Sequence, residues 1–417
     1  MLEARDRVGG RVWTDTLPDG TRVDRGGGWL AERHTAILGL ANEVGVSTYK
    51  TWTVGDHLLV IGGDVKRYRG LIPKIGVLPI VSLSLSMARL DRMAKTLPLD
   101  EPWNAKRASQ WDARTIASFI EKMPTAVARE LFDGSTRGLF TEDLANVSLL
   151  HFLFLIRSAG NLNTLLSIKG GYQENLVDGG AGETARRVAA ELGDAVRLRS
   201  PVRSIAHRDD GVTVTADGVT VEARAAVVAL PPVVILDIDF DPPLPDDRAT
   251  LYRRAVVGHE TKTLVVYDEP FWRADGLSGQ MFEPGSAAEV TLDASPASGK
   301  PGVIAVFTFG PVAERSDAMD ADVRRKAVLD VLTTRLGSRA ASPVEFVETL
   351  WKFEEWTRGC TMAHYAPGLL TTYGRLLREP HGRIHWAGTE TATMSHGAID
   401  GAVRSGERAA REIAQRL

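Results

Sequence analysis

Apolar and polar positions follow different periods in different parts of the 417-residue chain. Residues 1–50 are rich in glycine and contain one helix-like run, Thr35–Val44. Residues 51–176 carry apolar pairs at helical spacing, as in "ASFIEKM" and "SLLHFLFLI", and predict a mostly helical segment. In "GETARRVAAELGD" the apolar positions share one helical face, and Gly193 is placed to end the helix. These changes, together with the length, predict two or three domains or subdomains.

Short strands are predicted after that helix. Asp-Gly pairs at 210–211 and 217–218 flank alternating apolar positions, which is typical of hairpins, and the apolar "AAVVAL" predicts a buried strand. Further strands are predicted in "TKTLVVY", "GVIAVFTFG" and "RIHWAG", with helices at 323–336 and 401–417. The last helix would place four apolar residues on one face: Ala402, Val403, Ala410 and Ile413. A helix that leads into an antiparallel ribbon and a buried strand is typical of a nucleotide-type α/β domain.

The most apolar stretch is "LIPKIGVLPIVSLSLSMARL", Leu71–Leu90. Lys74, two prolines and three serines interrupt it, so it falls short of the ~20 clean apolar residues of a membrane-spanning helix. We expect a buried helix or a pocket wall there. The N-terminal residues also lack the pattern of a signal peptide, which favours a cytoplasmic protein without a membrane anchor.

The net charge limits the kinds of partner that the sequence predicts, and the cysteine content limits the disulfides and metal sites. The formal net charge of -3 predicts neither nucleic acid nor an anionic membrane as a partner, and favours a small-molecule substrate. Cys360 is the single cysteine, so the chain has no intrachain disulfide and no cysteine zinc cluster, and no metal site is predicted.

Glycine-rich segments near the two ends of the chain predict a ligand between them. In "MLEARDRVGGRVWT", Leu2-Glu3 resembles the end of a buried strand, and Gly9-Gly10 a tight turn where backbone approaches a ligand. "RIHWAG" leads through polar residues to a predicted helix start near Gly401, and such a terminus favours a phosphate or an anionic ring edge.

Several blocks occur in the order found in the flavin-dependent monoamine oxidase family, which the chain resembles from Met1 to Leu417. They are "LEARDRVGGRVWT", "DRGGGWL", "EPFWR", "RGC", "APGLLTTYGRLLREPHGRIHWAGTETAT" and "GAIDGAVRSGERAAREI". The resemblance implies an α/β fold of two domains. A Rossmann-like FAD-binding domain of the glutathione reductase type would comprise 1–50, 177–251 and 354–417, and a substrate domain 51–176 and 252–353.

The resemblance implies FAD as the cofactor. Glu3 would bind the adenosine ribose, Gly9, Gly10 and Arg11 would follow the pyrophosphate and ribityl chain, and Glu390 would face the ribityl-phosphate region. Residues 26–29 would pass near the isoalloxazine, and the backbone of Val202 would meet the adenine. The full implied set is Glu3, Arg5, Gly9, Gly10, Arg11, Gly26, Gly27, Gly28, Trp29, Val202, Trp351, Cys360, Gly388, Thr389, Glu390, Gly397, Ala398 and Ala402.

The same resemblance places Lys262 at the lysine that holds a water against flavin N5. From its alternating strand alone, Lys262 would instead be predicted to face solvent. The flavin would take two electrons from an amine carbon, and O2 would reoxidise it to give H2O2, while the imine product hydrolyses. The last helix would stabilise the reduced flavin near Gly401 and Ala402. A homodimer is left open.

Two features near the flavin depart from the family pattern. Cys360 aligns with the cysteine that mitochondrial members join covalently to the flavin, but we expect non-covalent FAD, with a covalent link to Cys360 as the alternative. The paired aromatic residues of the substrate cage are replaced by Thr361 and Ala398. His396 or Tyr365 would then substitute for them, or the pocket would take a bulkier or non-amine substrate, such as a specialised metabolite.

A third departure concerns the start. Family members carry a strand, a G-x-G-x-x-G turn and a helix about thirty residues before the "LEARD" block, and this sequence has none of these. Two explanations are open: a start placed too late in an active enzyme, or a shortened, non-catalytic homologue that binds flavin poorly. Lys262, Glu3, Arg11 and "GTETAT" favour a flavin enzyme.

Overall fold

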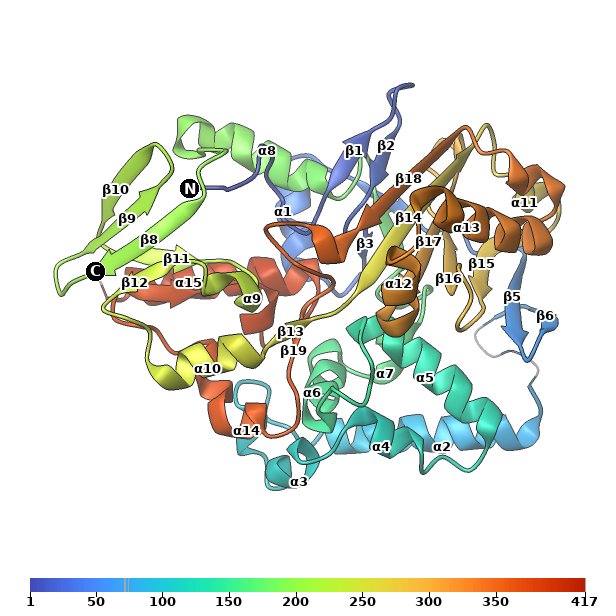
Figure 1. The fold of residues 1–417 in the computed structure, drawn as a ribbon, viewed down its shortest axis with the longest axis horizontal. Coiled ribbons are helices and arrows are strands. Elements are labelled where there is room, and N and C mark those ends of the chain that lie inside the picture. The colour runs from blue at the N-terminus through green and yellow to red at the C-terminus, as the bar shows by residue number, and fades with distance from the viewer. Residues whose placement is uncertain (71–72, 74, 417) are drawn as a thin grey trace.

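The computed structural model describes residues 1–70, 73 and 75–416. Figure 1 shows a mixed α/β molecule with one β-rich region on the left, a large sheet on the right and a layer of helices along the lower edge. Both chain ends lie in the left-hand region. The α/β class predicted from the sequence is confirmed.

The left-hand region contains a four-stranded sheet in the order β10-β9-β8-β12. Its strands are β8 (Val202–His207), β9 (Val212–Ala216), β10 (Val219–Ala223) and β12 (Asp239–Asp241). Residues 210–211 and 217–218 connect the three antiparallel strands, so both predicted Asp-Gly turns are confirmed. β12 runs parallel to β8 at the opposite edge.

Two parallel pairings lie beside this sheet. β11 (Ala226–Val228) pairs with β20 (Ile384–Trp386), which is buried at all three positions. Leu2 forms a parallel bridge with Arg197. The prediction of a buried "AAVVAL" strand is wrong for most of its residues: Val228 is buried, but Val227 and Leu230 are 45% and 37% exposed.

The large sheet contains seven strands in the order β18-β14-β17-β16-β15-β5-β6. They are β5 (Asp56–Ile61), β6 (Asp64–Tyr68), β14 (Glu260–Tyr267), β15 (Leu277–Phe282), β16 (Val290–Asp293), β17 (Gly302–Phe309) and β18 (Glu345–Leu350). β14 is buried at all eight positions because both faces of the sheet are covered. Helix α13 (Ala321–Leu336) packs on one face, and the hairpin of β1 (Thr14–Thr16) and β2 (Arg22–Asp24) covers the other.

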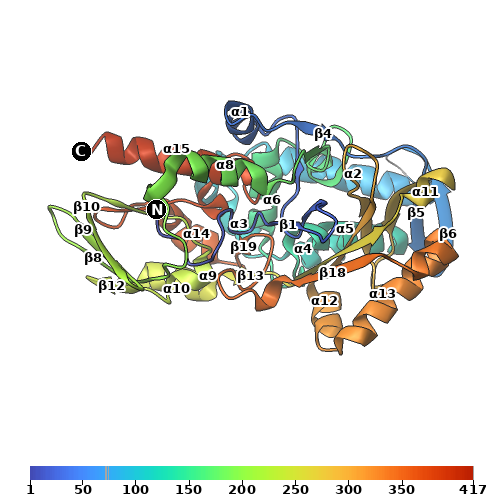
Figure 2. The same ribbon diagram turned by 90° about the horizontal axis from the view of Figure 1, so that it is seen from above.

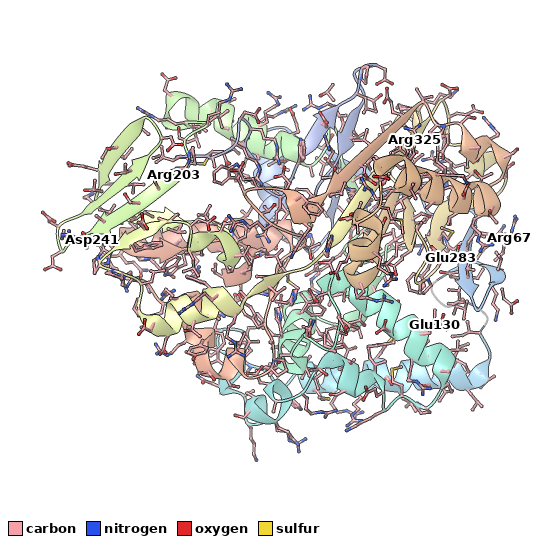
Figure 3. All side chains as sticks on the ribbon, in the orientation of Figure 1. Arg67, Glu130, Arg203, Asp241, Glu283 and Arg325 are labelled. Carbon is pink, nitrogen blue, oxygen red and sulfur yellow. The ribbon has the colours of Figure 1, made fainter. Side chains whose placement is uncertain are left out.

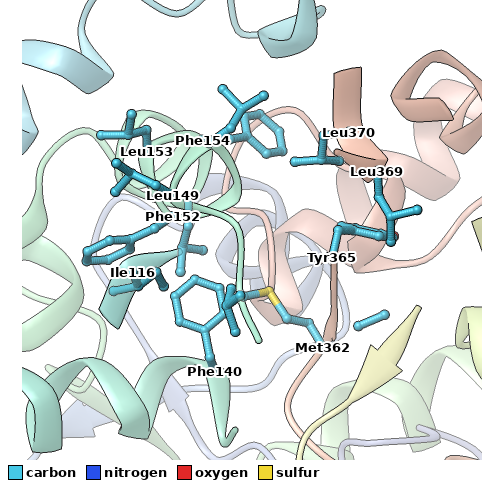
Figure 4. Packing of buried hydrophobic residues seen from close by; sticks show 14 of the residues in the cluster. Ile116, Phe140, Leu149, Phe152, Leu153, Phe154, Met362, Tyr365, Leu369 and Leu370 are labelled. Carbon is cyan, nitrogen blue, oxygen red and sulfur yellow. The ribbon is translucent and has the colours of Figure 1, made fainter. Parts of the chain in front are cut away.

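The helical layer is built around α6 (Leu149–Ala159), in which ten of eleven residues are buried. The Ser148 side chain accepts the amide of Leu150 and caps this helix, and Gly160 follows its end. Figure 4 shows Phe140, Phe152 and Phe154 packed in this core, with Met362 and Tyr365 reaching it from the C-terminal part of the chain. Its neighbours are α2 (Val77–Ala94), α3 (Ala108–Asp112), α4 (Ile116–Ile120), α5 (Ala126–Phe140) and α7 (Leu162–Leu166).

Helix α2 corrects the prediction for the most apolar stretch. Ser82, Leu90 and Ala94 are buried, but Leu78 and Leu85 are 74% and 67% exposed, so the expectation of a buried helix holds for one face only. Leu71, Ile72 and Lys74 of that stretch lie outside the described residues. Among the described residues, no helix has the length and apolarity needed to cross a bilayer.

Three helices bring the ends of the chain together: α1 (Thr35–Glu43), α8 (Gly182–Leu192) and α15 (Ile399–Ala414). Figure 2 shows α8 and α15 on the same side of the molecule, and α1 packs on α15 through Ile37 and Val403. The predicted apolar face of α15 is wrong: Ala402 and Ala410 are exposed, while Gly401, Ser405 and Ala409 are buried. Small residues lie on the buried face because α15 approaches its neighbours closely; a Cβ on Gly401 would lie 2.2 Å from the Ser395 carbonyl.

The remaining elements are short connections. β3 (Trp29–Leu30), β4 (Thr48–Lys50) and β7 (Asn175–Val177) form a three-stranded sheet, and β13 (Val256–Val257) pairs with β19 (Ala363–His364). The further helices are α9 (Pro232–Ile235), α10 (Asp246–Arg254), α11 (Phe271–Ala274), α12 (Gly310–Asp317) and α14 (Leu369–Tyr373). Six 3-10 turns complete the described elements: η1 (Pro102–Asn104), η2 (Gly193–Ala195), η3 (Ser338–Ala341), η4 (Trp351–Phe353), η5 (Gly374–Leu377) and η6 (Thr389–Thr391).

Candidate functional site

Lys262 lies on β14, an interior strand of the large sheet next to the edge strand β18, and is 2% exposed, so the prediction of a solvent-facing lysine is wrong. Its Nζ donates a hydrogen bond of 2.8 Å to the Gly26 carbonyl and lies 4.8 Å from the Trp29 ring centroid and 5.4 Å from that of Phe307. Burial lowers the pKa of Lys262, and the negative charges of Asp24 and Glu260 oppose that shift. The lysine is therefore held rigidly against the glycine-rich segment.

Lys262 and Trp29 also line a cavity of about 250 Å³. Asp24, Tyr49 and Gly180 contribute to its wall. Asp24 is half-buried, accepts the amide of Ala181 at 3.0 Å, and has its pKa raised by burial of its carboxyl group although Lys262 attracts its charge. An acidic and a basic group thus face the same small space.

Glu260 is a site residue that the sequence reasoning missed. It is buried two positions before Lys262 on β14, and its charge acts on the buried Cys360 thiol. Burial raises the pKa of Glu260 to about 7, against a favourable interaction with Lys262, and burial beside this carboxylate raises the pKa of the Cys360 thiol. The strand period of two was the signal, because it places Glu260 and Lys262 on one face.

Arg11 joins three distant segments. Its guanidinium donates to both carboxylate oxygens of Glu390, at 2.6 and 2.9 Å, and to the Thr361 carbonyl at 2.8 Å. Glu390 also accepts the amide of Ala363, and the ion pair with Arg11 lowers the pKa of this carboxyl against the effect of burial. The family resemblance predicted that Arg11 offsets phosphate charge. Most of its N–H donors are instead hydrogen-bonded to Glu390 and Thr361 of the protein itself.

The segment 3–10 bends sharply. Gly9 and Gly10 have φ of +97° and +57°, and a Cβ on Gly10 would meet no atom within 4 Å, so this turn faces open space. Glu3 accepts the amide of Arg5 at 2.9 Å, and Arg5 forms an ion pair of 2.8 Å with Glu354. Glu3 therefore turns toward its own loop, and Arg5 is engaged by the protein.

Gly26 and Gly28 lie too close to their neighbours to carry side chains. A Cβ on Gly26 would lie 2.2 Å from the Arg11 carbonyl, and one on Gly28 would lie 2.9 Å from Asp24 Oδ2. Gly27 donates its amide to the Arg11 carbonyl at 3.1 Å. The structure thus brings the Lys262 segment and the Arg11 segment together through backbone. Trp351 supports them from behind, being buried and donating to the Arg25 carbonyl at 3.1 Å.

The residues before α15 form the third side. Gly388 has φ of +108° and donates its amide to the Ser405 hydroxyl, while the Thr389 hydroxyl donates to the Ala398 carbonyl at 2.9 Å. Gly397 has φ of +80°, and a Cβ there would lie 2.5 Å from the sulfur of Met362. The helix N-terminus at Ala398 is thereby fixed next to β19. Val202 begins β8 and is half-buried.

Two histidines and a tyrosine surround the positions of the missing aromatic pair. The Tyr365 amide donates to Nδ1 of His151, so His151 carries its proton on Nε2 and donates it to Nε2 of His396 at 3.1 Å. Burial lowers the pKa of His396 to about 4, and the ring lies 4.9 Å from that of Phe154 on α6. The Tyr365 hydroxyl is buried without a partner among the described residues, and the Thr361 hydroxyl makes a long 3.4 Å contact to the Leu139 carbonyl.

The residues present fit an FAD group. The open turn at Gly10 leaves room for a phosphate chain next to backbone amides. Helix α15 begins near the Arg11–Glu390 ion pair, because the hydroxyl of Thr389, the neighbour of Glu390, donates to the carbonyl of Ala398 at the start of the helix. The indole N–H of Trp29 and the Tyr365 hydroxyl are buried polar groups without partners in the described part of the chain. Such groups are expected where a bound molecule completes the hydrogen bonding.

Comparison with known proteins assigns the chain to a class. A model of the family described as flavin containing amine oxidoreductase matches residues 1–414. The protein named flavin-containing monoamine oxidase AofH of Mycobacterium tuberculosis is 37% identical over 418 residues, which cover 100% of this chain and 91% of that protein. Amine oxidase [flavin-containing] B of Sus scrofa is 37% identical over 420 residues, covering 99% of this chain and 81% of that protein.

Solved structures agree with these sequence matches. A putrescine oxidase solved with putrescine bound superposes with a TM-score of 0.96 at 32% identity, covering 100% of this chain and 93% of that one. Cyclohexylamine oxidase from Brevibacterium oxydans gives a TM-score of 0.94 at 31% identity with the same coverage.

Proposed function

The chain belongs to the family of flavin-containing amine oxidoreductases, and from that membership we propose that it is an FAD-dependent oxidase of a small amine. The proposed reaction takes two electrons and two protons from the carbon–nitrogen bond of a primary amine and passes them to O2. It yields one imine and one H2O2, after which water converts the imine into a carbonyl compound and ammonia. One observation carries the proposal: a lysine buried on an interior strand, fixed at 2.8 Å from the Gly26 carbonyl of the glycine-rich segment and flanked by Trp29.

When bound, FAD supplies a two-electron acceptor that O2 can reoxidise. Gly9 and Gly10 would hold its phosphates through backbone amides, and Glu3 would bind the ribose. Residues 26–29 and the N-terminus of α15 would enclose the ring. The segments 1–50, 177–251 and 354–417 would form the domain that holds it, and 51–176 with 252–353 the substrate domain.

Lys262 would hold a water molecule at the reacting edge of the site. Burial favours the neutral amine, which accepts a hydrogen bond from water, whereas Asp24 and Glu260 favour the ammonium form, which donates one. The bond to the Gly26 carbonyl keeps Nζ in place in either state. The site thus has a basic group whose protonation depends on two nearby carboxyl groups.

Non-covalent attachment of FAD is the mode that the local chemistry supports. Only a thiolate attacks as a nucleophile, and burial beside Glu260 holds the pKa of the Cys360 thiol well above its usual range. Cys360 therefore stays protonated. This free thiol also fits the reducing cytoplasm, where we place the protein.

The substrate pocket supports an aliphatic amine. With Thr361 and Ala398 in place of two aromatic rings, the space in front of the ring would be wider, and the Tyr365 hydroxyl has no hydrogen-bond partner among the described residues. Putrescine oxidase and cyclohexylamine oxidase are named for aliphatic amines. The same wide pocket favours, as a second candidate, flavin-dependent oxidation of a bulkier specialised metabolite.

An assay of peroxide release tests the proposal. Purified protein is saturated with FAD and supplied with aliphatic mono- and diamines in air. We expect H2O2 and carbonyl product in equal amounts with at least one amine. Flavin binding without peroxide from any amine would instead support the second candidate.

A further inference from the structure

Glu260 on β14 is an acidic residue that the fold keeps away from water. It is 5% exposed, whereas Glu130 and Asp241, which Figure 3 labels, lie at the surface, where their protons exchange with solvent. Taking a carboxylate out of water costs free energy. A buried acid inside a reaction site is therefore a candidate for a role in the reaction.

The charge of Glu260 has no bonded cation to compensate it. Glu390, another buried glutamate, is paired with Arg11 at 2.6 Å. Glu260 forms no ion pair with the described residues, and the titratable groups that act on it are Lys262 and the Cys360 thiol. Burial raises the pKa of Glu260 to about 7 against the attraction of Lys262. Its carboxyl group therefore changes its charge near neutral pH.

The position of Glu260 puts this carboxyl group in the wall of the candidate flavin site. Glu260 and Lys262 face the same side of β14, because side chains alternate along a strand. Phe309, a neutral residue, lies opposite Glu260 on β17. The Cys360 amide donates to the Gly258 carbonyl at 3.1 Å, which holds the thiol beside the carboxyl group. The surroundings of Glu260 thus contain one basic group and one thiol.

We propose that Glu260 takes up a proton when the bound FAD is reduced and gives it back when O2 reoxidises the flavin. The inference rests on the proposed function, because it requires FAD in the site. Two electrons and one proton leave a negative charge on the flavin ring, and a nearby buried carboxylate is repelled by that charge. Binding of a second proton to Glu260 removes this repulsion.

The balance of the proposed reaction supplies this second proton. Conversion of the amine into an imine releases two electrons and two protons. The electrons and one proton pass to FAD, and the other proton converts the Glu260 carboxylate into a carboxylic acid. O2 then takes the two electrons, one proton from the flavin and one from Glu260, and becomes H2O2. The flavin and Glu260 both return to their starting states.

Counting protons during reduction tests the inference without any amine. FAD-loaded protein in weak buffer is reduced electrochemically in the absence of O2, and an indicator dye reports the protons taken up. We expect about two protons per FAD at about pH 8, and about one at about pH 5.5, where Glu260 is protonated in both states. The slope of the flavin midpoint potential against pH should be about twice as steep at the higher pH.

Two substitutions of Glu260 assign the second proton to its carboxyl group. Glu260→Gln should take up about one proton at both pH values. Glu260→Asp keeps a carboxyl group and should keep a pH-dependent second proton, which separates ionisation from packing. Glu314→Gln, on the exposed side of α12, is the matched control and should give the wild-type count.

The outcomes separate this inference from the proposed function. One proton at both pH values in the wild type would overturn the inference alone, and so would two protons at the higher pH in Glu260→Gln, which would assign the second proton to Lys262. A wild-type protein that binds no FAD would refute the proposed function and the inference with it. Two protons in a protein that no amine reduces would support the inference and contradict the proposed substrate.

Discussion

The charge of Lys262 depends on residues that approach it from two directions. Glu260 lies two positions earlier on β14, and Asp24 faces the same cavity from β2. Glu260 is buried and Asp24 is half-buried, so each favours a proton on Lys262 more strongly than an exposed acid would. The Cys360 thiol, whose pKa is raised by burial beside Glu260, belongs to the same cluster.

Replacing Lys262 tests its role in the reaction separately from any role in folding. In Lys262→Met the buried ammonium is lost, so we expect a stable protein that binds FAD but is reduced by amine on the order of 100-fold more slowly. Stopped-flow reduction under anaerobic conditions measures this rate. Lys326→Met, at an exposed lysine of α13, is the control and should reduce at the wild-type rate. Equal rates in both variants would remove Lys262 from the mechanism.

The raised pKa of Glu260 predicts that the free energy of unfolding depends on pH. Its pKa is about 7 in the folded protein and 4.5 as an ordinary carboxyl, so between these values the folded state binds more protons than the unfolded state. The free energy of unfolding contributed by Glu260 therefore falls as pH rises from 4.5 through 7, by up to about 3 kcal/mol. Urea unfolding should show wild type losing this amount relative to Glu260→Gln between about pH 4.5 and pH 8.

Glu314→Gln, on the exposed side of α12, is the control for that measurement and should follow the wild-type pH curve. Parallel curves for wild type and Glu260→Gln would show that Glu260 ionises equally in both states.

At the residue scale, the sequence predicted Lys262 only through the family resemblance. Its alternating strand indicated a solvent-facing side chain, because nothing in the local pattern shows that both faces of the sheet are covered. Glu260 could have been found from its spacing to Lys262 alone. Its contact with Cys360 could not, since it joins residues 100 positions apart in the chain.

The elements of the site are held together by the Arg11–Glu390 pair. The loop after Leu2, β19 and the turn before α15 meet at this one contact. Glu390 is almost wholly buried, with a side-chain exposure of 2%, so its charge depends on Arg11 for compensation.

Removing Arg11 should therefore destabilise the protein strongly. Arg11→Met leaves a buried carboxylate without its partner, and urea unfolding should show a loss of about 3–5 kcal/mol. The double variant Arg11→Met/Glu390→Gln should regain part of the lost free energy of unfolding. Arg203→Met breaks an exposed ion pair with Asp217 and should cost less than about 1 kcal/mol. A loss no larger than that of the Arg203 variant would contradict the assigned role of the pair.

The periods of α6, β14 and β20 predicted these elements correctly. For α8 they predicted the helix and its end at Gly193, but Leu192 of the predicted apolar face is 51% exposed. The pattern of apolar residues predicted the wrong buried face where a helix has close neighbours or none. Small residues replace large ones on the buried face of α15 because neighbours approach closely, and apolar residues of α2 remain exposed. Periodicity identifies the helix in both cases but cannot identify what lies against it.

At the scale of the whole molecule, four segments far apart in the chain form one site. Residues 9–29, Lys262, residues 360–365 and residues 388–398 are linked by the bonds of Arg11 to Thr361 and Glu390 and of Lys262 to Gly26. The glycine-rich ends of the chain predicted a ligand shared by the first and last of these segments, but only the family resemblance added Lys262 and residues 360–365.

The central claim is that this site passes electrons from an amine to FAD. Anaerobic addition of aliphatic amines to the FAD-loaded protein, followed by air, measures it directly. We predict that an amine bleaches the visible absorption of the oxidised flavin, and that O2 restores it with release of one H2O2 per flavin. Unchanged flavin absorption with every amine tested would contradict the account.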